Sequence, residues 1–272
     1  MRPGVLTVYR WELRKLVMLK RTYMGFAIAI AMPLIFVTAL ALRHGQPNDI
    51  LFGRLVRQSG LAIPLVILVF GSIWLFPLVT SLVAGDIVAS EDHNGTLKTI
   101  LTRSLDRGKI FAGKVLATVT YVMVALLLMA VVAIIAGGIQ SGIHPITSLS
   151  GTHVGTGKAF GLIAASLGVY LWPMLSIAGI GLLLSTATRN SAGAVVGTLM
   201  IALVLQIVSI LPGMESVRPY LLPEQFNAWH GLLREPTDWA PIVRAAWVCA
   251  LYGLLPLGAA YLVFLRRDVA GG

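Results

Sequence analysis

The residues of this 272-residue chain whose types could support chemistry gather between Gly85 and Lys114. Within this stretch, Gly108 to Lys114 fits the G-x-x-x-x-G-K pattern of a loop that binds nucleotide phosphates. The next residue, however, is Val115, which has no hydroxyl to bind magnesium, and the run enters an apolar segment instead of following a buried strand. We therefore predict that this loop does not bind ATP.

The other polar residues of the stretch make it the most charged interruption of an apolar chain. It holds four of the eleven acidic residues and five of the Lys and Arg residues: Asp86, Glu91, Asp92, Asp106, Lys98, Arg103, Arg107, Lys109 and Lys114. A polar, helix-forming insert between two apolar segments is a place where a cytoplasmic partner could bind the membrane part.

Other catalytic patterns are absent from the sequence. The five histidines fall in expected loops without the spacing of paired metal ligands; they are His44, His93, His144, His153 and His230. No G-x-S-x-G run occurs. The single cysteine, Cys249, excludes a disulfide framework and a cysteine-based metal cluster. We predict no metal, no cofactor and no enzymatic activity on this chain.

The composition points to lipid as the solvent. Hydrophobic residues make up 57% of the chain and charged residues 12%, about half the roughly 25% found in soluble domains, and the mean hydropathy is +0.86. The formal charge of +10 comes mostly from Lys and Arg near the ends of apolar segments, where they contact lipid headgroups. We therefore expect membrane lipid, and not nucleic acid, as a partner, and no removable signal peptide.

Six apolar segments are each near the roughly 20 residues needed to cross a bilayer. They cover about 23–42, 61–84, 115–136, 159–188, 191–211 and 242–265. The fourth and fifth meet at Arg189 and Asn190, which predicts a tight helical hairpin. Internal prolines are either hinges or simply tolerated; they are Pro33, Pro64, Pro77, Pro173 and Pro256. We predict an all-α polytopic membrane protein with a single six-span domain over 23–265.

The distribution of Lys and Arg predicts the orientation. With the N-terminus inside, cytoplasmic positions hold 14 of these 21 residues: six in 1–22, five in 85–114, and Arg189, Arg266 and Arg267. The other seven would lie outside: Arg43, Arg54, Arg57, Lys158, Arg218, Arg234 and Arg244. This twofold excess predicts both termini in the cytoplasm, a multi-pass protein of the cell membrane, and a cytoplasmic tail at 266–272.

Two further segments have helical periodicity. In 1–22, apolar residues recur at helical spacing and arginines occupy the rest of the wheel; the apolar set is Val5, Tyr9, Leu13, Leu16 and Val17. This predicts an amphipathic helix at the cytoplasmic interface, with a simple basic tail as the alternative. In 212–241, Phe226, Trp229 and Leu233 share one helical face. We expect short helices dipping into the outer interface there, with the tryptophan at headgroup level.

The middle of every predicted span lacks ionisable residues, which argues against an intramembrane enzyme and against proton or sodium coupling. Energy must then come from elsewhere. The deep polar side chains Tyr121, Tyr170 and Gln206 are the candidates for a cargo cavity. Gly193 and Gly197 place small residues on one face of the fifth span, which permits close contact with another subunit or within the chain.

The polar insert itself predicts a short helix parallel to the membrane. The second span should continue to about Glu91 and break at Asn94-Gly95. Thr96 can cap a new helix whose apolar face is formed by Leu97, Ile100 and Leu101. Lys98, Thr99, Thr102 and Arg103 would face away from it. A solvated hairpin without a partner is the alternative.

This pattern resembles the cytoplasmic loop of ABC-2 type permeases, the membrane subunits of ATP-driven exporters. The matching residues are Glu91, Gly95-Thr96-Leu97, Leu101-Thr102-Arg103, Arg107 and Lys114. Ser104 stands where that family often has proline. The resemblance extends to an N-terminal Tyr-Arg-Trp-Glu-Leu-Arg-Lys helix, six spans, and a Phe-Leu-Arg-Arg-Asp ending at Phe264–Asp268.

The resemblance implies specific roles and partners. The N-terminal helix, with Tyr9, Glu12, Leu13 and Leu16, would be the interfacial connecting helix. Thr96–Arg103, flanked by Glu91, Gly95 and Arg107, would be the coupling helix that binds a separate ATP-binding subunit. Two copies of that subunit, carrying ATP and magnesium, would serve two permease chains, identical or homologous, with Gly193 and Gly197 at their contact.

Two functions follow from the resemblance. The first is a permease subunit that exports a hydrophobic or amphipathic cargo, such as a drug, a peptide antibiotic or a lipid, from the cytoplasm or inner leaflet. The alternative is a non-transporting subunit that passes ATP-driven motion to an outer partner, with 212–241 as the docking surface.

Overall fold

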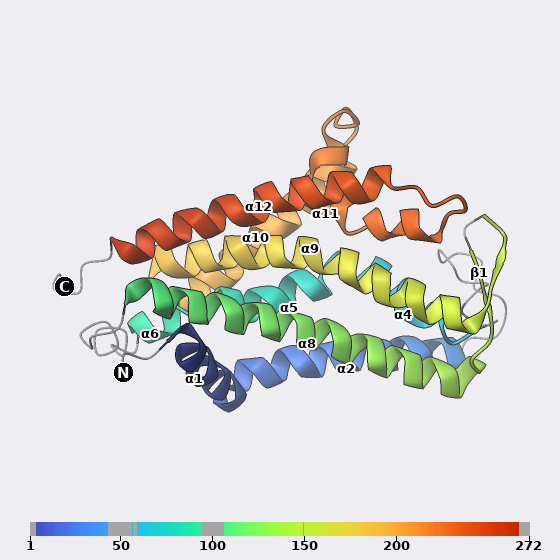
Figure 1. The fold of residues 1–272 in the computed structure, drawn as a ribbon, viewed down its shortest axis with the longest axis horizontal. Coiled ribbons are helices and arrows are strands. Elements are labelled where there is room, and N and C mark those ends of the chain that lie inside the picture. The colour runs from blue at the N-terminus through green and yellow to red at the C-terminus, as the bar shows by residue number, and fades with distance from the viewer. Residues whose placement is uncertain (1–3, 43–55, 57–58, 94–105, 149, 267–272) are drawn as a thin grey trace.

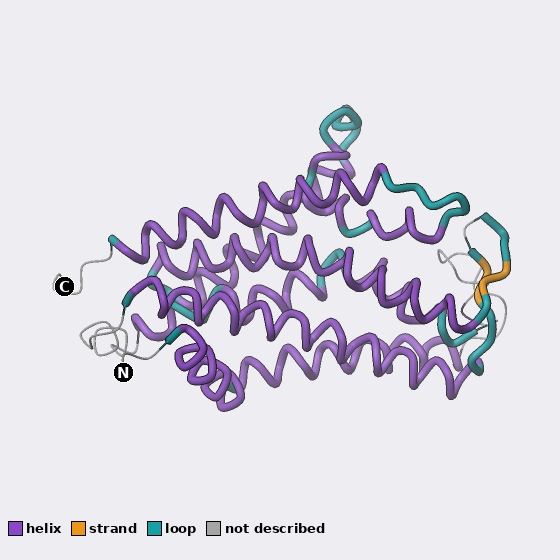
Figure 2. Tube along the Cα trace, in the orientation of Figure 1, coloured by secondary structure: helices purple, strands orange, loops and turns teal. Residues whose placement is uncertain are grey.

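The computed structural model describes residues 4–42, 56, 59–93, 106–148 and 150–266. They form an elongated bundle of helices with the N- and C-termini at the same end (Figure 1). Figure 2 shows that strand is confined to a small hairpin at the opposite end, where β1 (Ile146–Thr147) pairs antiparallel with β2 (His153–Val154). Apart from this hairpin, the described residues confirm the predicted helical architecture.

Five helices in the described part of the chain are long and apolar enough to cross a membrane. They are α2 (Lys20–Leu42), α8 (Arg107–Ser141), α9 (Thr156–Thr188), α10 (Ser191–Ile210) and α12 (Ala240–Leu265). The predicted second span is broken into α4 (Ala62–Gly71) and α5 (Leu75–Ala84), with a bend of 67°. Counting this bent pair as one span gives the predicted six.

The break in the second span has a local cause. In a regular helix the ring of Pro77 would clash with the carbonyl of Ile73, which disfavours a continuous helix through this turn. The ring of Phe76 folds back over Gly71, where a Cβ would lie 2.5 Å from Phe76 Cε2. In contrast, Pro33 and Pro173 lie inside uninterrupted helices. Proline therefore breaks a helix in the second span and is tolerated in the first and fourth.

The predicted hairpin between the fourth and fifth spans is confirmed. Arg189 adopts a left-handed conformation with φ of 55° and ends α9. Asn190 then caps α10, because its side-chain oxygen accepts a hydrogen bond of 3.0 Å from the Gly193 amide. The two residues reverse the chain without any additional loop.

The N-terminal helix α1 (Val5–Met18) lies within residues 1–22, where the sequence predicts a helix. Its buried residues are Val8, Glu12 and Leu16, spaced by four. Tyr9 and Leu13 pack partly against the core, whereas Val17 is 61% exposed. The face that α1 turns towards the bundle thus carries a carboxylate, that of Glu12, and the position of the helix at a membrane interface stays a prediction.

The segment 212–241, which was predicted to lie outside, folds into three short helices: η1 (Arg218–Tyr220), α11 (Leu222–Gln225) and η2 (Ala228–Leu233). Phe226, Trp229 and Leu233 are all buried, and the rings of Phe226 and Tyr170 lie 4.9 Å apart. Trp229 therefore packs inside the protein and not against lipid, and its position at headgroup level stays a prediction. Periodicity identified an apolar face but could not show that the protein interior, and not lipid, covers it.

Candidate functional site

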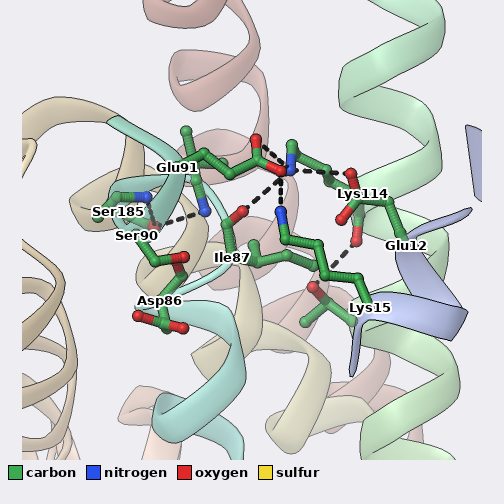
Figure 3. A network of polar contacts seen from close by, with 11 residues as sticks. Glu12, Lys15, Asp86, Ile87, Ser90, Glu91, Lys114 and Ser185 are labelled. Carbon is green, nitrogen blue, oxygen red and sulfur yellow. Dashed lines mark hydrogen bonds and ion pairs between the residues drawn. The ribbon is translucent and has the colours of Figure 1, made fainter. Parts of the chain in front are cut away.

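A buried lysine is the centre of the polar end of the bundle. The side chain of Lys114, in α8, is 0% exposed. Its Nζ lies 3.0 Å from Glu12 Oε1 and 2.7 Å from Glu91 Oε2, and it donates a hydrogen bond of 3.0 Å to the carbonyl oxygen of Ile87 (Figure 3). All three ammonium donors therefore have an acceptor, and two carboxylates compensate one buried cation.

The residue before this lysine explains how α1 approaches so closely. A Cβ on Gly113 would lie 2.6 Å from Val8 Cγ1 and 3.1 Å from the Tyr9 backbone nitrogen. The absence of a side chain therefore lets α1 cross directly over α8, and the Tyr9 hydroxyl forms a hydrogen bond of 2.8 Å with Thr120 Oγ1. The Gly-Lys pair that imitates a phosphate-binding loop is a helix-crossing point followed by an ion-pair centre.

The second carboxylate comes from α6 (Ala89–His93), the short helix that follows the broken span. Glu91 pairs with Lys15 of α1 as well as with Lys114. The start of α6 is held by α9, because Ser185 Oγ accepts hydrogen bonds from the backbone nitrogens of Val88 at 3.1 Å and Ala89 at 3.0 Å. The helix is thus fixed from two sides.

Two more acidic residues attach the same segment to other helices. Asp86 pairs with Arg21 at the start of α2 and accepts a hydrogen bond from the hydroxyl of Ser191, the first residue of α10. Asp92 lies 3.7 Å from Arg189 in the turn between α9 and α10. Residues 86–92, which lead directly into 94–105, are therefore connected to α1, α2, α8, α9 and α10.

The predicted coupling residues divide into two groups. Gly95, Thr96, Leu97, Ile100, Leu101 and Arg103 lie outside the described residues. Glu91 and Arg107 are described, and both interact within the chain: the Glu91 side chain is 1% exposed, and Arg107 donates a hydrogen bond of 2.8 Å to the carbonyl oxygen of Leu265 at the end of α12. Glu91 is thus buried in an ion pair within the chain, and the coupling roles of Glu91 and Arg107 stay predictions.

The predicted cargo residues have different surroundings in the structure. Tyr121 and Tyr170 are buried, and Tyr170 donates its hydroxyl hydrogen to Leu68 O at 2.8 Å. Gln206 is half-buried on α10. Contact of these three residues with cargo stays a prediction.

An apolar cavity of about 340 Å³ lies instead between α8, α9 and α12. Its wall includes Val119, Trp172, Leu175 and Leu254. The nearby hydroxyls already have acceptors within the protein, since Thr118 donates to Lys114 O at 3.0 Å and Ser176 donates to Cys249 O at 2.8 Å. This cavity can therefore accept an apolar group that makes no hydrogen bonds.

The predicted permease contact lies on the thinly covered helix α10. Gly193 is exposed and Gly197 is half-buried, 3.2 Å from Leu184 Cδ1 when a Cβ is placed on it. One glycine therefore permits packing inside the chain, whereas the other leaves α10 open. A contact between two permease chains through them stays a prediction.

The sequence reasoning missed the pairing of Glu12 with Lys114, although one signal was present. Glu12 lies on the same stripe as Val8 and Leu16, where an unpaired carboxylate would be unfavourable.

Among the described residues, no group of three or more His, Cys, Asp or Glu side chains could hold a metal ion.

The described residues form an all-α fold with five or six apolar helices able to cross a membrane, which is consistent with a polytopic membrane protein. The chain belongs to the DUF2705 family of proteins of unknown function, whose family model matches residues 50–270. No curated protein matches the chain.

Proposed function

We propose that this chain is the permease subunit of an ATP-driven exporter of the ABC-2 type, energised by a separate ATP-binding subunit that docks on residues 96–103. The observation that carries the proposal is the attachment of residues 86–92 to five helices through ion pairs and hydrogen bonds. A force applied to the insert would reach all of these helices, because its carboxylates are bound to them.

The apolar cavity supports a hydrophobic or amphipathic cargo. At about 340 Å³, it falls within the usual size range of small-molecule sites. Its hydroxyls are used internally, so a polar cargo would lose hydrogen bonds to water without replacement. The cargo would leave the cytoplasm or the inner leaflet, in keeping with the orientation that the charge distribution favours.

Affinity purification of the wild-type chain from its own cell membranes tests this proposal. We expect an ATP-binding chain to copurify in equal amount, with ATP hydrolysis that hydrophobic compounds stimulate. Copurification of an ATP-binding chain with an outer protein, and no stimulation by any hydrophobic compound, would favour the non-transporting alternative. Purification without any ATP-binding chain would contradict both.

A further inference from the structure

A second charged region lies in the segment 212–241. A cavity of about 270 Å³ opens between η1, α11, η2 and the first turn of α12. Three arginine residues from separate elements line it: Arg218 from η1, Arg234 from the residue after η2, and Arg244 from α12. Such convergence of like charges is unfavourable unless negative charge compensates it.

The compensation by the described residues is incomplete. Arg234 pairs with Asp238, with 3.2 Å between NH1 and Oδ2. Glu224 borders the cavity, but it forms no direct ion pair with Arg218 or Arg244 within the described part of the chain, although both act on it electrostatically. Burial, with Arg234 contributing, lowers the pKa of His230 to about 4, so this ring is neutral at neutral pH. Three arginines thus line the cavity with a single carboxylate, that of Glu224, while Asp238 and Glu215 act on Arg234 and Arg218 from outside the lining.

One donor in the cavity lacks an acceptor. Arg218 Nε is buried and has no hydrogen-bond partner among the described residues. A buried donor without an acceptor is unfavourable, and an anion in the cavity would supply one. Guanidinium groups present their donors as a planar fork that matches the oxygens of phosphate.

We propose that this cavity binds a phosphate oxyanion between Arg218 and Arg244. Two sources share this chemistry: the headgroup of a phospholipid, and free phosphate or a small phosphate ester. The cavity borders the first turn of a membrane-crossing helix, which is where a headgroup lies in a bilayer. The inference is independent of ATP-driven export.

Glu224 provides a test of the proposal, because its negative charge would repel an anion bound in the cavity that it lines together with the arginines. If Arg218, Arg244 and Glu224 merely form a structural charge network, neutralising any of them weakens the same unit. If the cavity binds an oxyanion, neutralising Glu224 removes repulsion and tightens binding, whereas neutralising the arginines weakens it.

The experiment measures phosphate binding to the purified full-length chain in two arms. One arm titrates inorganic phosphate against the chain in neutral detergent by calorimetry. The other adds phosphatidylglycerol and counts retained lipid by native mass spectrometry. Arg218→Gln and Arg244→Gln should each weaken binding about tenfold or more, as expected for loss of a charge-assisted contact, and Glu224→Gln should strengthen it.

Lys158→Gln is the matched control, because it removes an exposed cation that does not border the cavity. It should leave binding unchanged. Binding of either probe with the expected arginine dependence supports the proposal, and the arm that responds identifies the source. Should an arginine variant fail to fold, the Glu224→Gln result decides. Binding in neither arm, equal loss in Lys158→Gln, or weaker binding in Glu224→Gln would overturn the proposal.

Discussion

The charged regions around Lys114 and around Arg218 differ in how their buried charged groups are compensated. Around Lys114 every ammonium donor has an acceptor, and both carboxylates belong to the chain itself. Around Arg218 three arginines line a cavity whose lining holds one carboxylate, that of Glu224, and a buried donor has no acceptor in the described residues. The region around Lys114 is therefore a structural ion-pair centre, in which the chain's own groups compensate its charges. The region around Arg218 is a cavity in which a ligand could supply the missing acceptor.

The largest expected effect on stability concerns the ion-pair centre around Lys114. Replacing Lys114 by Met leaves Glu12 and Glu91 buried without their common cation, which should cost about 3–5 kcal/mol of stability. Thermal unfolding of the purified protein in detergent measures this loss. Lys158→Met, at an exposed lysine, is the control, and a loss no greater than in this control would contradict a closed ion-pair centre.

The next effect tests the close crossing of helices beside that centre. Gly113→Leu should displace α1 from α8 and cost about 1–3 kcal/mol, as for overpacking in a core. Gly161→Leu in α9 is the matched control, since nothing lies within 4 Å of a Cβ placed there. Equal thermal stability of the two variants would show that α1 does not pack on Gly113.

The segment 212–241 should respond to pH through His230, whose pKa is lowered to about 4 by burial and by Arg234. In the unfolded chain this histidine titrates near 6.5. Between these values the unfolded state binds more protons, so the stabilising contribution is full above about pH 6.5 and is lost as pH falls towards 4.

We therefore expect the wild-type protein to lose up to about 2 kcal/mol between pH 7 and pH 5 through this group. Unfolding midpoints of the wild-type protein and His230→Gln at both pH values measure it, and because both proteins keep Glu224, its titration cancels in the difference. An identical pH response in the two proteins would mean that His230 is not buried as described.

The smallest expected effect on stability concerns the arginine-lined cavity around Arg218, measured without ligand. Arg244→Gln removes one of the converging cations and breaks no ion pair among the described residues, so its stability should change by about 0.5 kcal/mol or less. A near-zero change in stability for Arg244→Gln, together with a large loss for Lys114→Met, would separate the two charged regions most clearly. A loss of several kcal/mol, measured by thermal unfolding without phosphate, would mean that Arg244 belongs to a closed network like that of Lys114.

The sequence predicted the parts of this structure that depend on local periodicity. The apolar segments at 23–42 and 191–211 correspond to α2 and α10. The break in the second span was also accessible, since Pro77 was a kink candidate. The surroundings of an apolar face were not predicted: Trp229 was expected at the outer interface and is buried within the protein, because periodicity does not show what covers an apolar stripe.

The charged contacts could not be predicted from spacing, because they join distant residues. Glu12 and Lys114 are 102 positions apart, and Arg218 and Arg244 meet through three short helices without a regular period. Only a bundle that brings α1 onto α8 makes the first pair visible. The residue types predicted that the insert is charged and polar. Its attachment to five helices could be seen only in the three-dimensional structure.

The central claim, that residues 96–103 bind an ATP-hydrolysing subunit, is tested most directly by its retention during purification. The double substitution Leu97→Asp with Leu101→Asp places charge on the predicted apolar face, where each leucine contributes roughly 1.5–3 kcal/mol if buried. Thr99→Asp with Thr102→Asp adds the same charge to the opposite face. We predict that the leucine variant loses the copurifying ATP-binding chain and its ATPase activity while the threonine variant keeps both. Retention of that chain, with normal ATPase activity, by the leucine variant would contradict the account.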